Sequence, residues 1–308
     1  MQLKTNITLD KYPDSLTSEK LTSPPSPPIL RRVMGFGRKR EAEAKLPNVV
    51  LFGSTGCGKS SVVNMLLDGN DRGVAPANVS SRATGCTFES KFYVAEIGGK
   101  DYKVWDTTGL NEGDEGTVAN TEAFRQLCRL IKHLSYKSSG VSLLVFVMRG
   151  PRVTENNEKN FEVFFDGFCQ KEVPIVIAVT GLENEEVIDQ WWVDNKSAFD
   201  KRQMHFNGSA CITATPGNYH KVLKCGVHEH VYRESIPKVQ RLITQHCAEK
   251  GWKKKPNAWV TRCWKWTTKA FGPKPTHFNT GAEMTTAAIN DILISLGSDD
   301  ESSSGDEK

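Results

Sequence analysis

The chain has 308 residues, of which 40 are basic and 36 acidic, so its formal net charge is only +4. Such a balance gives no case for a protein dedicated to nucleic acid, and we expect no nucleic-acid partner. The sequence opens with no signal peptide and contains no apolar run of transmembrane length. Its eight cysteines include no C-x-x-C pair, which indicates reduced thiols. We therefore expect a cytoplasmic protein.

Composition divides the chain into four parts. Residues 1–46 are rich in Pro and Ser and then basic, which predicts a disordered segment that serves as a solvated linker, a polyproline ligand or a surface-seeking basic patch. Residues 298–308 are acidic and rich in Ser, which predicts a disordered tail. We expect the folded domain at 47–250, followed by a basic and aromatic extension at 251–297.

Apolar strand-like runs alternate with longer helical stretches between the tails. This alternation predicts an α/β domain with a mostly parallel sheet. The glycines at 98 and 99 predict a hairpin, so the two strands on either side should form one antiparallel edge. The expected strands are 48–52, 87–97, 101–106, 141–148, 174–180 and 210–214, and the expected helices are 59–68, 118–134, 155–169, 184–201 and 228–249.

Residues 53–60 read GSTGCGKS, a complete phosphate-binding loop between a predicted strand and a predicted helix. Only a glycine-rich turn lets successive backbone N–H groups converge on phosphates at a helix N-terminus. Lys59 should reach the terminal phosphates and Ser60 should ligate Mg²⁺. The predicted nucleotide-binding residues here are Gly53, Ser54, Thr55, Gly56, Cys57, Gly58, Lys59, Ser60 and Ser61.

A second phosphate-binding element follows the third strand, which ends in Asp106-Thr-Thr-Gly109. The Asp106 carboxylate can hold Mg²⁺ through water, and the Gly109 amide can sense the terminal phosphate. Thr87 lies just before the edge strand, where a threonine can close over Mg²⁺, and Thr84 is the second candidate. We therefore predict Ser60, Thr87 and Asp106 at the metal, and Lys59, Thr87 and Gly109 as the catalytic group.

These motifs resemble those of the translation-factor-class, Ras-like GTPases. Within that class the chain is similar to septin-like and immunity-associated (AIG-type) GTPases and to fungal P-loop proteins of that kind. Residues 148–155, MRGPRVTE, resemble the G-R-x-T-x-E segment of the immunity-associated group. The resemblance covers about residues 47–250 and implies a three-layer P-loop NTPase fold, a Ras-like G domain, with GTP and Mg²⁺ as ligands.

The resemblance also implies where the guanine base is read. Thr180 and Glu183 stand where the family has [NT]-K-x-D, with Gly181 in place of the lysine that packs against the base. The Glu183 carboxylate would accept the guanine N1 and amine hydrogens. Residues 211–215, CITAT, resemble the S-A-K loop, so the Ala214 N–H would meet the guanine oxygen.

Hydrolysis should be slow, because Leu110 stands where Ras-type enzymes have the glutamine that orients water. Glu112 or a group from a second subunit could supply the missing function, since the resembled families often pair across their nucleotide faces. We expect a nucleotide-gated switch or assembly factor with weak GTP hydrolysis. A non-hydrolysing scaffold and an ATP-using P-loop enzyme remain alternatives.

Aromatic and cationic side chains alternate at residues 251–277. Three interpretations stay open for this segment. It can dock on the domain with its lysine stems outward, contact a membrane surface, or contact nucleic acid, for which the net charge gives no support.

Overall fold

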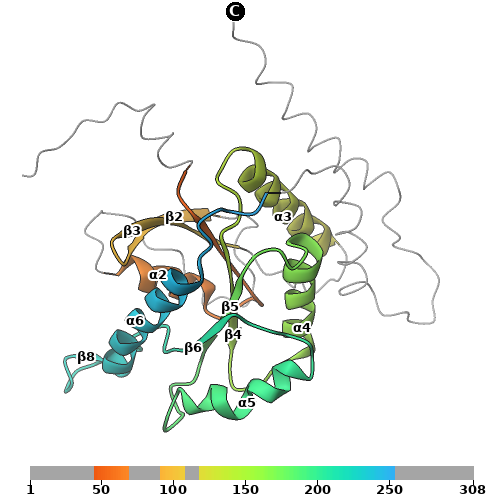
Figure 1. Cartoon of the computed structure of the whole chain (residues 1–308). Helices are drawn as coiled ribbons and strands as arrows, with labels where there is room; N and C mark the ends of the chain where they lie inside the picture. Colours follow the sequence, from red (N-terminus) through yellow and green to blue (C-terminus); the bar gives the residue numbers. More distant parts are fainter. Residues whose placement is uncertain (1–44, 69–90, 108–117, 254–308) are drawn as a thin grey trace, which may run out of the picture.

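The computed structural model describes residues 45–68, 91–107 and 118–253, and only the backbone over 118–125 (Figure 1). Residues 1–44 of the disordered segment predicted at 1–46 therefore lie outside the described residues, as does the tail predicted at 298–308. So does all but the start of the extension predicted at 251–297.

A six-stranded sheet in the order β2-β3-β1-β4-β5-β6 forms the centre of the molecule. All neighbouring strands are parallel except β2 and β3, which form an antiparallel pair at one edge. The prediction of a mostly parallel sheet with one antiparallel edge is confirmed. The strands are β1 (Asn48–Phe52), β2 (Lys91–Ile97), β3 (Lys100–Asp106), β4 (Leu143–Arg149), β5 (Ile175–Thr180) and β6 (Gly208–Cys211).

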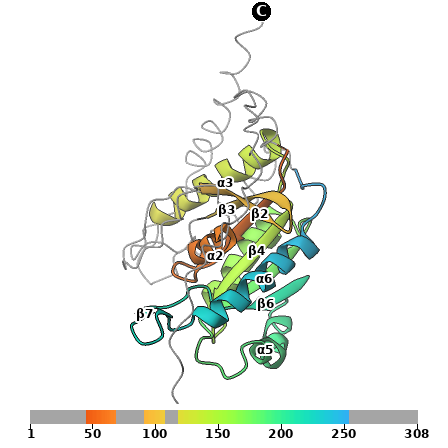
Figure 2. The same cartoon turned by 90° about the vertical axis from the view of Figure 1, so that its left-hand side faces the viewer.

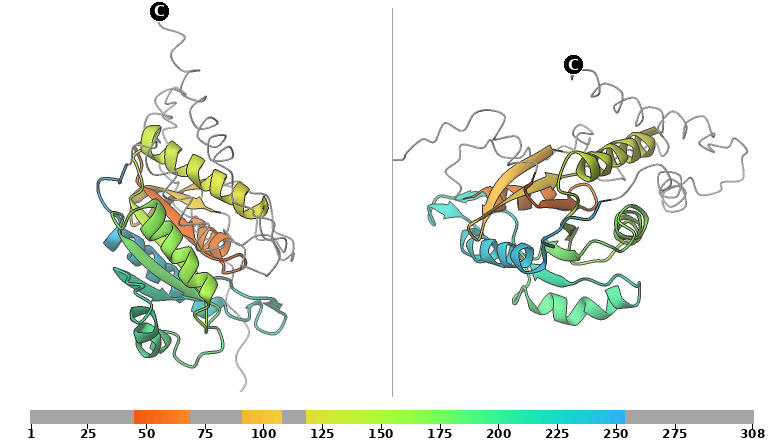
Figure 3. Two further views of the ribbon diagram at one scale, coloured as in Figure 1. Left: turned by 90° about the vertical axis from the view of Figure 1, so that its right-hand side faces the viewer. Right: turned by 45° about the horizontal axis from the view of Figure 1, so that its top comes forward.

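Helices cover both faces of this sheet, which gives the three layers of a P-loop G-domain fold (Figures 2 and 3). One face carries α2 (Lys59–Leu67) and α6 (Glu229–His246). The other carries α3 (Val118–Tyr136), α5 (Gln190–Asp200) and α4 (Glu155–Phe161), which continues as the π-helical turn η1 (Glu162–Phe168).

The strand sequences explain the two cores. Successive side chains of a strand point to opposite faces, so Val49 and Leu51 belong to the core under α2 and α6, while Val50 and Phe52 belong to the core under the helices of the other face. A central strand buried on both faces must be apolar throughout, as β1 and β4 are. The Phe52 ring stacks on Phe164 with a centroid distance of 4.3 Å.

Three local features differ from the sequence-based expectation. Residues 184–189 form turns, so the helix predicted from 184 begins at Gln190. A small hairpin of β7 (Tyr219–His220) and β8 (Cys225–Gly226) precedes α6, and its two-residue strands are too short to produce an alternating pattern. Trp252, which the predicted boundary at 250 leaves outside the domain, exchanges two backbone hydrogen bonds with Val141.

The helices described here were also compared with the length and apolar character that a membrane span requires. Among the described residues, no helix meets both conditions.

Candidate nucleotide-binding site

The phosphate loop connects β1 to α2 and depends on three glycines with positive φ. These angles are +149° at Gly53, +73° at Gly56 and +100° at Gly58. A Cβ at Gly53 would overlap the carbonyl oxygen of Val147, so that position also requires glycine for space. The loop can therefore turn its backbone N–H groups inward at the start of α2, as phosphate binding requires.

Lys59 is the buried cation of this loop. Its Nζ donates hydrogen bonds of 3.0 Å to the carbonyl oxygens of Gly53 and Ser54, so the ammonium lies across the loop. The first turn of α2 contains no acidic residue, so the helix itself places no carboxylate at its positive end. Both features favour an anion at this point.

The metal ligands predicted from two separate motifs lie together. Ser60 Oγ, in the first turn of α2, donates a 2.5 Å hydrogen bond to Asp106 Oδ2 at the end of β3. Thr107 fixes that strand end through a 2.7 Å hydrogen bond from Oγ1 to the Leu51 carbonyl. A hydroxyl and a carboxylate are hard oxygen donors and fit Mg²⁺, so Ser60 and Asp106 are the residues that would hold it. When bound, Mg²⁺ supplies neutralisation of phosphate charge.

Several predicted residues of the switch and hydrolysis regions cannot be placed. Thr84, Thr87, Gly109, Leu110 and Glu112 all lie outside the described residues. Their predicted roles at the metal and at the terminal phosphate stay predictions.

The end of β5 packs directly on the phosphate loop. Thr180 is buried, and its Oγ1 donates a 2.7 Å hydrogen bond to the carbonyl oxygen of Cys57. A Cβ at Gly58 would come within 3.3 Å of Thr180 Cγ2, so the Thr180 side chain lies close to the Gly58 backbone. Leu182 is buried beyond it and Glu183 is half-buried. The segment predicted to read the base is thus joined to the loop predicted to bind phosphate.

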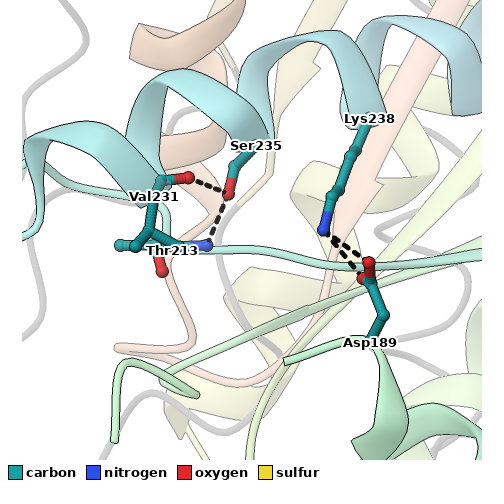
Figure 4. A network of polar contacts seen from close by, with 5 residues as sticks. All are labelled: Asp189, Thr213, Val231, Ser235 and Lys238. Carbon is teal, nitrogen blue, oxygen red and sulfur yellow. Dashed lines mark hydrogen bonds and ion pairs between the residues drawn. The ribbon is translucent and has the colours of Figure 1, made fainter. Parts of the chain in front are cut away.

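The second predicted base loop is held by α6 (Figure 4). The buried Ser235 hydroxyl accepts a 3.0 Å hydrogen bond from the Thr213 backbone N–H and donates a 2.7 Å bond to the Val231 carbonyl. Ala214, whose N–H is predicted to meet the guanine oxygen, follows directly and is buried. One turn along α6, Lys238 pairs with Asp189 at 2.7 Å, but this pair is partly exposed and stabilises little.

Two asparagines of α4 also support the phosphate loop. Asn160 Nδ2 donates a 3.1 Å hydrogen bond to Ser54 Oγ, and Ser54 Oγ lies 3.4 Å from Asn157 Oδ1. Thr154, in the segment that resembles the immunity-associated group, caps α4 by accepting from the Asn157 N–H. Sequence analysis missed both asparagines. Their spacing of three residues places them on one helix face and was the only available signal.

Burial governs the chemistry of the loop cysteine. Desolvation raises the pKa of the Cys57 thiol, and the nearby Lys59 charge only partly opposes this shift. The thiol therefore stays protonated, which makes it a poor nucleophile. Cys57 contributes its backbone to the loop, through the carbonyl that accepts from Thr180.

A separate cavity of about 460 Å³ lies between α5, β6 and α6. Its lining residues fall between 189 and 246 and include Lys238 and Arg241, but no residue of the phosphate loop. We therefore assign it no part in phosphate binding.

A glycine loop around a buried lysine, a serine–aspartate pair beside it and a strand-end threonine on its backbone define a nucleotide-binding P-loop G domain. Residues 48–180 match the family model described as 50S ribosome-binding GTPase, which is less than half of the chain. This segment is therefore similar to P-loop GTPase domains. The ribosome in that description belongs to the family model. Among curated proteins, no sequence matches the chain.

Solved structures give a more distant likeness. A structure from work on the chloroplast translocon components atToc33 and psToc159, whose dimerisation is described as important for GTPase activity, is 19% identical with a TM-score of 0.47. It covers 72% of this chain and 90% of that one. Toc33 from Arabidopsis thaliana with GDP and Mg²⁺ is 18% identical over 69% of this chain and 90% of that one, with a TM-score of 0.44. Elongation factor SelB from Methanococcus maripaludis is 14% identical over 66% and 34%, with a TM-score of 0.38.

Proposed function

We propose that this chain is a guanine-nucleotide-binding protein with slow intrinsic GTP hydrolysis, acting as a nucleotide-gated switch or assembly factor. The observation that carries the proposal is the convergence of two distant segments on one phosphate loop. Asp106, from β3, reaches Ser60, and Thr180, from β5, reaches the carbonyl of Cys57. A change at the terminal phosphate would then change the conformation of the loop that follows Asp106. This coupling is the basis of the proposed nucleotide gating.

Guanine rather than adenine is the proposed base. Burial of Leu182 fixes the chain next to Glu183, and the Ser235 hydroxyl fixes the loop before Ala214. A carboxylate that accepts two hydrogens and an amide that donates one match the edge of guanine. Adenine offers the opposite pattern at its N1 and N6, so it would leave the carboxylate without donors.

Two substitutions of Glu183 test this assignment. Glu183→Ala should weaken GTP binding far more than ATP binding, and Glu183→Gln should narrow the difference between the two nucleotides. Glu185→Ala is a matched control, because this exposed carboxylate lies two residues further along the same turn. Equal losses for GTP and ATP in the Glu183 variants would contradict guanine recognition by this residue and favour the ATP-using alternative.

Slow hydrolysis is proposed because Leu110 cannot orient the attacking water. We further propose that a homodimer through the nucleotide face completes the site. Single-turnover hydrolysis measured over a range of protein concentrations should then rise with concentration. A fast rate independent of concentration would point to a residue within the chain, such as Glu112. No hydrolysis at any concentration would favour the non-hydrolysing scaffold.

We propose that the protein is related to the immunity-associated branch of the P-loop GTPases. We also propose that it is located in the cytoplasm. Thr154 of the resembling segment caps α4, the helix whose Asn157 and Asn160 contact Ser54 of the phosphate loop, and this structural role supports the first part. The eight cysteines of the sequence include no C-x-x-C pair, which supports a reducing compartment. Localisation of the tagged full chain by microscopy tests the second part.

A further inference from the structure

An arginine lies where the lysine of the base-reading motif would begin. Gly181 occupies the lysine position and has φ of +74°. A Cβ built at Gly181 would lie 2.8 Å from Arg149 Cγ, 3.3 Å from Arg149 Nε and 3.5 Å from Arg149 Cζ. The arginine stem and its guanidinium therefore pass over the glycine, and a larger side chain at 181 would compete with them for the same volume.

The sheet holds Arg149 at this point. Arg149 is the last residue of β4 and is the register partner of Thr180, the last residue of β5. The following Gly150 N–H donates a 2.7 Å hydrogen bond to the Thr180 carbonyl. A Cβ at Gly150 would lie only 2.5 Å from Leu182 Cδ2, so the absence of a side chain there lets Leu182 pack close. The position of Arg149 relative to Gly181 is thus fixed by backbone pairing.

We propose that Arg149 replaces the missing lysine and that its guanidinium covers one face of the bound guanine base. This inference rests on the proposed guanine-binding function. A planar guanidinium stacks on aromatic rings better than an ammonium does. An arginine from the neighbouring strand can therefore pack against the base in place of a lysine from the motif itself. Glycine at 181 is then a requirement of the arrangement, because it leaves room for the arginine.

The first test separates base binding from phosphate binding. Arg149→Ala should weaken GDP binding roughly 5- to 30-fold, the range expected for a cation–aromatic contact, measured by calorimetry with Mg²⁺. Its affinity for tripolyphosphate, which has no base, should be unchanged. Arg149→Lys should retain part of the GDP affinity. Arg152→Ala is the control for loss of an exposed arginine from the same segment, and it should leave both affinities unchanged.

A double-mutant cycle tests the steric relation. Gly181→Ala should weaken GDP binding, because the new Cβ displaces the arginine stem from its position. In the Arg149→Ala background, Gly181→Ala should reduce the GDP affinity by a clearly smaller factor. The backbone strain of alanine at positive φ is present in both backgrounds and cancels in the cycle.

Three outcomes would overturn the inference. These are an unchanged GDP affinity in Arg149→Ala, equal losses of GDP and tripolyphosphate affinity, and an additive cycle with Gly181. The second outcome would make Arg149 a phosphate-attracting charge. Failure of the guanine assignment itself is distinguishable, because the wild-type protein would then bind ADP as tightly as GDP.

Discussion

Replacing Thr180 by valine removes one hydroxyl from the contact that joins the base-reading segment to the phosphate loop. Valine keeps the branched shape that packs against Gly58, so the main loss is the 2.7 Å hydrogen bond to the Cys57 carbonyl. That carbonyl would stay buried without its donor, which costs about 1–3 kcal/mol of unfolding free energy. For a domain of this size the melting temperature should fall by roughly 2–12 °C.

Thermal unfolding and GDP titration measure this effect. We expect the melting temperature to fall as above and GDP affinity to fall about tenfold, since the loop that binds phosphate loses its support. Thr213→Val is the stability control, because the buried Thr213 Oγ1 has no hydrogen-bond partner among the described residues. That variant should melt at or above the wild-type temperature. A Thr180→Val protein with wild-type stability and affinity would refute the reasoning, as would equal destabilisation by the two variants.

Three further predictions use the same protein. Lys59→Ala should reduce GTP affinity at least about 100-fold in titration while circular dichroism stays unchanged, because Lys59 is a charge partner of phosphate; wild-type affinity would contradict this. Ser235→Ala leaves the Thr213 N–H unpaired, so the unfolding free energy should fall by about 1–3 kcal/mol. The affinity for GDP should fall more than the affinity for tripolyphosphate, and equal losses of the two affinities would count against a role of Ser235 in base binding. Burial and then two nearby lysines lower the pKa of His133 below 6.5, so stability is lost as pH falls through the folded-state pKa. Between about pH 7.5 and about pH 5.5, the unfolding free energy of His133→Gln, measured with urea, should fall less than that of the wild type. An equal fall in both proteins would refute this role of His133.

Local patterns in the sequence were sufficient for much of the fold and for the phosphate loop. The glycine spacing of residues 53–60 and the strand before it constrain the backbone over a few residues, so both could be predicted. The same holds for the hairpin at Gly98 and Gly99, which sets the antiparallel edge between β2 and β3. The meeting of Ser60 with Asp106 followed from the order of the two motifs, because the ends of neighbouring parallel strands share one edge.

The supporting contacts could not be predicted, because they join residues far apart in the chain. Whether Ser235 on α6 meets the Thr213 N–H depends on how the helix is rotated against the sheet. The relation of Arg149 to Gly181 depends on the register of β4 and β5, which no local pattern specifies. Sequence alone therefore identified Gly181 as a departure from the motif without identifying the residue that compensates for it.

Displacement of a fluorescent GDP analogue by unlabelled nucleotides, with Mg²⁺ present, tests the central claim most directly. If the loops around Glu183 and Ala214 read guanine, GTP should compete at least about 100-fold more tightly than ATP, because adenine leaves the half-buried carboxylate of Glu183 without its donors. Removal of Mg²⁺ should weaken GTP binding, because Ser60 and Asp106 then lose the cation that they are placed to hold. Equal displacement by ATP and GTP would contradict the account.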